Sequence, residues 1–253
     1  MIKTGLKFII FSLCLSSCAF FNKVSTAPDE IAPKVKNKFK LKDGSGEYSL
    51  LVEAGPGKGD KTYVVKRTIE TLGNKNRKTL EKSISISSKI EGELIPKISQ
   101  FSVWYNKHRH FSQIEMDLKE KQIKVTWDSP DPKFNGIKYF PIKNDKIIFC
   151  FFTQVIECAR QQGFLKKATK NEGGQLRMQI VWDGHPFFQQ QFENFNTHVT
   201  SPAVLEYDGR NRRRQKRFSL KVEGNAIFYF VDKTNQLMGQ YWIAKGLAIE
   251  RLK

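Results

Sequence analysis

Short stretches that alternate hydrophobic and polar residues dominate the chain after residue 46. KTYVVKRTIETLG places Tyr63, Val65 and Ile69 on one side, and EKSISISSKI alternates isoleucines, beginning with Ile84 and Ile86, with serines. This period of two is typical of half-buried antiparallel strands. Further stretches of this kind are ISQFSVWYNK, QIKVTWD, LRMQIVWD, FSLKVEG, AIFYFVD and the closing LMGQYWIAKGLAIERL.

One segment has the features of a helix. NDKIIFCFFTQVIECARQQG begins with Asn144 or Asp145 as a candidate N-cap and ends at Gly163, a common type of helix terminator. Its apolar residues cover nearly the whole circumference for two turns, which predicts a helix enclosed by the fold. A sheet of ten or more strands normally curls, closes or folds over. We therefore expect residues 47–253 to form a mainly β domain, an antiparallel half-barrel or open barrel with one central helix.

The N-terminus has the pattern of an export signal. Lys3 and Lys7 precede a short apolar stretch, FIIFSLCLS, which is too short to cross a bilayer as a permanent helix. The stretch runs into LSSC, ending at Cys18, which resembles the lipobox of bacterial lipoproteins. An ordinary signal peptide with an incidental cysteine, or an N-terminal core segment, is the alternative.

The lipobox resemblance implies where the mature protein is held. It implies cleavage before Cys18, diacylglycerol on its sulfur, and acylation of its new amino group with a palmitate-type chain. Several acyl chains make a stable anchor where a single chain is marginal. Residues 1–17 are then the signal peptide and residues 18–46 a lipidated tether. Ala19 after the cysteine favours the outer membrane, so the resemblance implies an envelope protein at the outer membrane that faces the periplasm.

The two remaining cysteines of the mature chain lie in the expected helix. Cys150 and Cys158 are eight residues apart, about 12 Å along a continuous helix. A disulfide needs Cα atoms within about 7 Å, so we expect the two not to pair and to act as small apolar residues. The sequence has no CxxC or other zinc-ligand spacing.

Positive charge is in large excess. The chain has 43 Lys and Arg against 25 Asp and Glu, a net charge of +18, which predicts attraction to nucleic acid, lipid headgroups or acidic glycans. The densest cluster is RNRRRQKR at 210–217. An exported protein seldom meets nucleic acid, and the octamer has no aromatic residue to stack on bases. Two interpretations of the octamer stay open. One is a solvated edge that prevents strand aggregation, and the other is a contact with anionic lipid, lipopolysaccharide or an envelope protein.

The octamer also has a predicted register. EYDG at 206–209 has the pattern of a hairpin turn, with the octamer opening the second strand. Extending the register of Phe218 backwards puts Lys216, Arg214 and Arg212 on the apolar side. Three unpaired cations cannot be buried, so we expect that side to open to water or to an anion. The candidate anion-binding residues are Arg210, Arg212, Arg213, Arg214, Lys216 and Arg217.

Two short motifs suggest ligands but have simpler interpretations. GPGKGD at 55–60 lacks the spacing of a phosphate-binding loop, and we expect a hairpin loop there. His108 and His110 point to one side if extended, and Glu115 and Asp117 lie nearby. The basic residues flanking and separating the histidines oppose a cation, so we favour a hairpin tip or edge over a metal site.

A third motif suggests catalysis. WDGHPFF at 182–188 sets Asp183 and His185 on either side of a glycine, a carboxylate beside an imidazole as in a hydrolase. Because Pro186 and Gly184 favour a tight turn, we interpret the motif as structural. We expect a protein that is not an enzyme and has neither a metal nor a cofactor; an envelope hydrolase is the third alternative.

The export signal, the β-rich chain, the ND…FFTQ…AR segment and the closing hairpin resemble uncharacterised β-half-barrel proteins of bacterial envelopes. They resemble LolA/LolB-like lipid carriers more loosely. This resemblance covers residues 47–253 and implies a concave binding face; a carrier needs a cavity of roughly a few hundred Å³. The expected function is a lipid-anchored envelope protein that binds an amphiphilic or anionic ligand or a partner in envelope maintenance. The alternative is a structural or protein-interaction lipoprotein without a small ligand.

Overall fold

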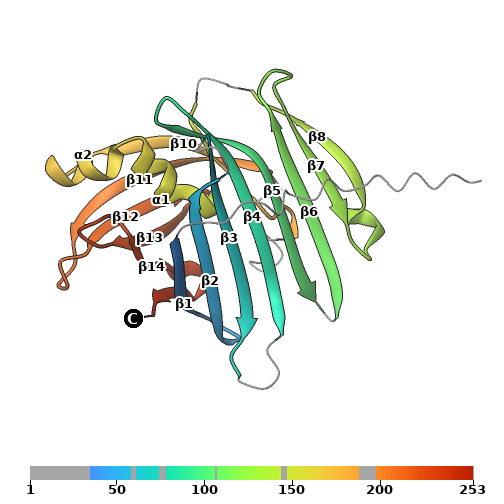
Figure 1. Ribbon diagram of the computed structural model, residues 1–253, viewed down its shortest axis with the longest axis horizontal. Helices are drawn as coiled ribbons and strands as arrows, with labels where there is room; N and C mark the ends of the chain where they lie inside the picture. The colour runs from blue at the N-terminus through green and yellow to red at the C-terminus, as the bar shows by residue number, and fades with distance from the viewer. Residues whose placement is uncertain are drawn as a thin grey trace, which may run out of the picture.

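The computed structural model describes residues 35–57, 61–73, 78–105, 107–143, 147–187 and 198–252. They form one open sheet of 15 strands with two short helices (Figure 1). The strands are β1 (Val35–Asp43), β2 (Gly46–Pro56), β3 (Thr62–Thr71), β4 (Thr79–Ile90), β5 (Glu93–Tyr105), β6 (His108–Asp117), β7 (Gln122–Asp128), β8 (Gly136–Pro141), β9 (Phe149–Phe151), β10 (Gln175–Val181), β11 (Thr200–Arg210), β12 (Lys216–Val222), β13 (Asn225–Val231), β14 (Leu237–Trp242) and β15 (Leu247–Arg251). The predicted mainly β, antiparallel class is confirmed.

The first strand, β1, lies in the middle of the sheet, and the later strands extend to one edge and then return from the other edge to the middle. Strands β1 to β8 follow one another as antiparallel neighbours, and the chain then crosses to the opposite edge. There β9 pairs in parallel with β10, and β10 to β15 return to the middle, where β15 pairs with β1. Because β8 and β9 are the two free edges, the sheet is not closed into a barrel.

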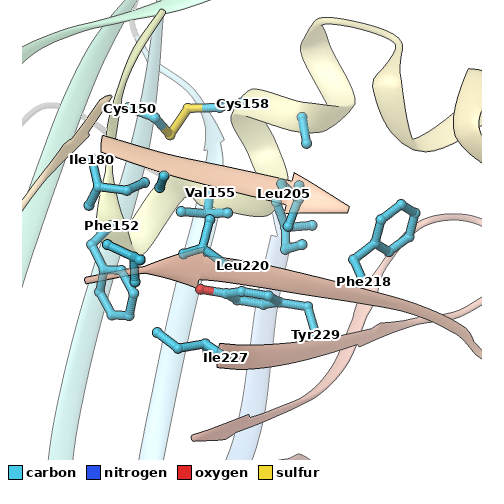
Figure 2. Packing of buried hydrophobic residues seen from close by; sticks show 14 of the residues in the cluster. Cys150, Phe152, Val155, Cys158, Ile180, Leu205, Phe218, Leu220, Ile227 and Tyr229 are labelled. Atoms are coloured by element: carbon cyan, nitrogen blue, oxygen red, sulfur yellow. A yellow bond between two sulfur atoms is a disulfide. The ribbon is translucent and has the colours of Figure 1, made fainter. Parts of the chain in front are cut away.

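The sheet is strongly curved, and its concave face holds the core. Phe39 and Leu50 from the first half share one buried cluster with residues of the second half. Among the latter are Phe218 and Leu220, which Figure 2 shows. A second cluster joins residues of β6 and β7, including Ile114 and Val125, to Phe151 and Val181 of β9 and β10. The β9 edge therefore packs onto the inner face of β6 and β7 without hydrogen bonding to β8.

Part of the predicted tether belongs to the sheet. Residues 35–43 form β1, which lies between β2 and β15. Phe39 and Leu41 face the core, while Lys38, Lys40 and Lys42 on the other side are exposed. The boundary predicted at residue 46 is therefore too late, because alternating lysines give one face of a strand the composition of a linker.

The predicted single helix is wrong in extent. Residues 149–151 form β9, because they pair with β10, and a 3-10 turn (Phe152–Gln154) follows. Helix α1 (Val155–Gln161) ends just before Gly163, whose φ of +69° separates it from helix α2 (Phe164–Lys170). Gly163 thus terminates a helix as predicted, but two short helices replace the single long one.

Cys150 and Cys158 form a disulfide, contrary to the prediction. Cys150 lies in β9 and Cys158 in α1, with Cα atoms 6.4 Å apart (Figure 2). The prediction failed because it assumed one unbroken helix between them. The disulfide fastens α1 to the edge of the sheet.

Polar residues form part of the concave face. On β4, Ser83, Ser85 and Ser87 are buried there, whereas Ile86 packs with Val64 in a small cluster on the other face. Ser87 Oγ donates to Gln154 Oε1 (2.5 Å), and Gln154 Nε2 donates to the carbonyl of Ser85 (2.9 Å). The serines therefore hold the segment before α1 against the sheet.

Candidate functional site

The turn of the β11–β12 hairpin lies within the basic octamer. Strand β11 continues through the predicted EYDG turn to Arg210, with an irregular register between Tyr207 and Arg210. Residues 211–215 make the turn. The Asn211 carboxamide oxygen accepts hydrogen bonds from the backbone N–H of Arg213 and of Gln215, both at 2.9 Å. The predicted turn position is therefore wrong by several residues.

Lys216 is the one cation of the predicted apolar register that is buried. It is 8 % exposed on the face that carries Phe218 and Leu220. Its Nζ donates to Asn235 Oδ1 (2.7 Å) and to the carbonyl of Lys233 (3.4 Å). Burial, and secondarily the charge of Arg210, lowers the pKa of its ammonium. Hydrogen-bond acceptors of the neighbouring turn thus accommodate the cation that was predicted to face water or an anion.

The other arginines of the octamer project from the hairpin. Arg212 and Arg214 lie in the turn, not in the strand, and both are exposed, so their predicted place on the apolar side is wrong. Arg217 pairs with Asp208 across the hairpin (Nε to Oδ2, 3.5 Å). Four exposed residues make no side-chain hydrogen bond or ion pair with any described residue. We call these the basic tip: Arg210, Arg212, Arg213 and Arg214.

The basic tip lies at the end of the sheet where β1 begins, which we call the proximal end. Lys216 pairs with Val231, and Val231 pairs with Leu237. Gly239, two residues further along β14, lies level with Glu250 and thus with Lys40. The start of β12 is therefore level with the first few residues of β1. Four strand spacings separate them, roughly 20 Å along the sheet.

The opposite, distal end lacks such a cluster among the neighbouring turns. The β1–β2 turn contains Asp43, Gly44 and Ser45, and Asp43 accepts hydrogen bonds from within the turn. The β12–β13 turn is Glu223-Gly224. In this part of the described sheet, the unpaired positive charge is therefore concentrated at the proximal end.

A pocket of about 90 Å³ opens on the concave face, and we call it the concave pocket. Strands of both halves and helix α1 line it, with Phe39, Leu50 and Ile249 among the apolar walls. Gln236 of the turn that binds Lys216 also lines it, so the pocket adjoins the proximal end. The volume is below the few hundred Å³ expected for a lipid carrier. It suits a small end group and not a complete acyl chain.

Charged and polar groups converge on the concave pocket. Arg67 of β3 lines it, and its guanidinium has no hydrogen bond or ion pair within the described residues. Arg160 of α1 also lines it and is engaged by Glu157 (3.6 Å) and by the carbonyl of Asn235 (2.6 Å). Tyr229 is 3 % exposed, and its hydroxyl has no hydrogen-bond partner among the described residues.

Two buried acids lie near Arg67. Burial raises the pKa of Glu81 to about 7, against the opposing effect of the Arg67 charge. Burial also raises the pKa of Asp183, although hydrogen bonds from Thr153 and Ser85 oppose the shift. Neither acid was singled out by sequence for this location. The sequence contains one sign of polar groups on this face, because Arg67 is a cation in the same register as the apolar residues Val65 and Ile69.

Asp183 and His185 have separate surroundings. The Asp183 carboxylate accepts hydrogen bonds from Ser85 Oγ (2.7 Å) and from the Thr153 hydroxyl. The His185 ring packs against Trp127 and Phe140, at centroid distances of 6.1 and 5.9 Å. The backbone N–H groups of residues 184 and 185 both donate to the carbonyl of residue 182, so the predicted tight turn is confirmed.

The paired histidines belong to a strand, not to a hairpin tip alone. His108 opens β6 and is exposed, whereas His110 Nδ1 is 2.9 Å from Ser129 Oγ. Glu115 lies on the opposite face of β6, where Lys124 Nζ approaches it at 2.9 Å. No cluster of three metal-ligating side chains occurs among the described residues. Of GPGKGD, residues 58–60 lie outside the described residues, but β2 and β3 flank the motif as the predicted hairpin.

A scan against protein-family models and searches of curated proteins and solved structures returned no match. The resemblances to bacterial lipoproteins, to envelope half-barrels and to LolA/LolB-like carriers therefore stay predictions. Cys18 and the whole of the predicted signal peptide lie outside the described residues. Within the described chain, no helix has the length and hydropathy needed to cross a membrane.

Proposed function

We propose that this protein is a non-enzymatic, lipid-anchored half-barrel protein of the bacterial envelope whose basic tip binds the anionic surface to which the chain is tethered. The observation that carries the proposal is the shared location of the basic tip and the start of β1 at the proximal end. A chain anchored by a lipid on Cys18 reaches the described domain at the start of β1. Attachment therefore brings Arg210, Arg212, Arg213 and Arg214 towards the membrane.

Two further observations support this proposal. The basic tip has no acidic partner among the described residues, so its charges are available to phosphate groups. The Cys150–Cys158 disulfide is typical of proteins that fold in an oxidising compartment such as the periplasm. Each basic side chain near an anionic membrane contributes about 1 kcal/mol, so four can supplement a lipid anchor substantially.

The exposed edge strand β8 supports a second candidate, a protein-interaction lipoprotein. Strand β8 has a neighbour on one side only, and Ile137 and Tyr139 are 46 % and 57 % exposed. Such an edge can pair with an extended segment of a partner. Lys138 and Pro141 on the same strand oppose this pairing, so we favour the membrane contact.

The test is charge reversal at the basic tip. In the chain from Ala19 onwards, which includes every described strand and no lipidated cysteine, Arg212→Glu, Arg213→Glu and Arg214→Glu together should weaken binding to phosphatidylglycerol vesicles. The loss of about 3 kcal/mol predicts at least a hundredfold lower affinity at low salt. Vesicle co-sedimentation measures it, and lipopolysaccharide aggregates provide a second anionic surface.

The matched control reverses three exposed lysines at the distal end, Lys42, Lys78 and Lys107. It changes net charge equally but should retain most of the binding. Equal losses in the two variants would reduce the interaction to net charge, and unchanged binding in the tip variant would refute the proposal. Raising the salt concentration should weaken the wild-type interaction, because ions screen exposed charges.

A further inference from the structure

The concave pocket contains polar groups that the membrane contact does not use. Tyr229 lies on β13 and Arg67 on β3, on opposite walls of the curved sheet, and both line the pocket. Figure 2 shows the Tyr229 ring below Leu220, with its hydroxyl directed to the side where Phe152 lies. Distant parts of the chain thus bring two hydrogen-bond donors to one cavity.

The position of the Tyr229 hydroxyl lowers the stability of the fold. It is buried, and it has no hydrogen-bond partner among the described residues. A buried polar group without a partner destabilises a fold, and phenylalanine would fill the same space without that cost. A ligand that accepts a hydrogen bond from the hydroxyl gives the group a function.

The guanidinium of Arg67 identifies the charge of such a ligand. It has no ion pair within the described residues, although it offers five N–H donors. Arg160 contributes a second positive charge, and its Nε also has no partner among the described residues. Glu157 pairs with Arg160, whereas the two acids near Arg67, Glu81 and Asp183, are buried and have raised pKa values. The pocket is therefore rich in hydrogen-bond donors.

Size limits the ligand further. An apolar cavity of about 150 Å³ holds benzene, so a pocket of about 90 Å³ admits a group of about four non-hydrogen atoms. A carboxylate with one attached carbon has this size, and a phosphate is slightly larger. The planar fork of arginine suits both groups, because it can donate two parallel hydrogen bonds.

We propose that the concave pocket is a binding site for a small oxyanion, a carboxylate or phosphate group held by Arg67 and the Tyr229 hydroxyl. This site is separate from the basic tip and does not depend on membrane contact. Arg160 lies beside the bound group at the end of the pocket that adjoins Gln236. The rest of a larger ligand extends towards the proximal end.

The experiment measures binding of acetate and of inorganic phosphate to the lipid-free chain from Ala19 by isothermal titration calorimetry. At least one anion should bind saturably at one site. Arg67→Gln should weaken that binding at least tenfold. Tyr229→Phe should weaken it several-fold while raising the midpoint of denaturant unfolding of the unliganded protein, which a merely structural tyrosine would not do.

Two controls separate this site from the membrane contact. Lys66→Gln removes a cation from the adjacent position on the opposite face of β3, and Arg213→Gln removes one from the basic tip; both should leave anion binding unchanged. Binding that depends on Arg213 but not on Arg67 would overturn the proposal. So would the absence of binding by both anions up to about 10 mM, a concentration that detects even weak sites. Acetate binding without phosphate binding would assign the site to carboxylates, and the reverse to phosphates.

Discussion

At the scale of single residues, the concave face departs from the usual division between an apolar inside and a polar outside. Glu81 has Ile69 and Val103 as its cross-strand neighbours and is 2 % exposed. Its Oε1 has no hydrogen-bond partner among the described residues. Burial favours the neutral carboxylic acid, whereas the Arg67 charge favours the carboxylate and the Asp183 charge opposes it. This balance makes the fold sensitive to pH.

Glu81 predicts lower stability as the pH rises. Because its pKa in the folded state is raised to about 7, the folded protein holds a proton that the unfolded chain has released between about pH 4.5 and 7. The stabilisation is full below the unfolded pKa and is lost as the pH rises through 7, with a total of about 3 kcal/mol. Asp183, whose pKa is also raised, adds a change of the same sign.

Urea unfolding between pH 5 and 8 measures this effect. Glu81→Gln should remove much of the decline and make the protein more stable than wild type at pH 8. Glu93→Gln, which changes an exposed carboxylate on β5, should leave the decline in place. A wild-type stability that rises from pH 5 to pH 8 would contradict the assignment.

The octamer shows how far register can be predicted for single side chains. The position of Lys216 on the face of Phe218 follows from the period of two and is confirmed. Extension of that period to Arg212 and Arg214 failed, because the Asn211 side chain bonds the backbone of the turn and ends the strand. A side chain that competes for backbone hydrogen bonds changes the local structure without changing the hydrophobic pattern.

At the scale of elements, long alternating strands were predictable and segments defined by distant partners were not. Most of the alternating stretches became strands, but Phe149–Phe151 is a strand only because β10 lies beside it. Apolar residues on all sides suit a buried strand and turn as well as a buried helix, so composition alone did not separate them. The disulfide was missed for the same reason, since its geometry depends on where the helix begins.

The disulfide predicts a measurable contribution to stability. Cys150→Ala with Cys158→Ala should lower the free energy of unfolding by roughly 2 to 3 kcal/mol, since a short loop is no longer closed in the unfolded chain. Urea unfolding with and without reductant measures the change. Reductant should destabilise the wild type but leave the double variant unchanged. Free thiols at both positions in the unreduced, folded protein would contradict the pairing.

At the scale of the whole molecule, the pairing of β15 with β1 determines which segments lie at the proximal end. The two halves of the sheet join there, so a segment near residue 35 and a hairpin near residue 213 lie at one end despite their distance in sequence. Charge and the lipobox resemblance predicted an anionic surface as the partner, but the sequence alone did not determine which part of the fold would face it. The strand order brings the basic tip and the start of β1 to the same end, which supports the proposed orientation.

The orientation of the lipidated protein on a membrane tests the proposed membrane contact most directly. Arg213→Cys at the basic tip and Gly44→Cys in the distal β1–β2 turn provide two sites for a fluorescent label. The full chain with Cys18→Ser controls for attachment and should not become lipidated. In phosphatidylglycerol vesicles with nitroxide-labelled headgroups, we expect strong quenching at residue 213 and little at residue 44. Equal quenching at both sites, or stronger quenching at residue 44, would contradict it.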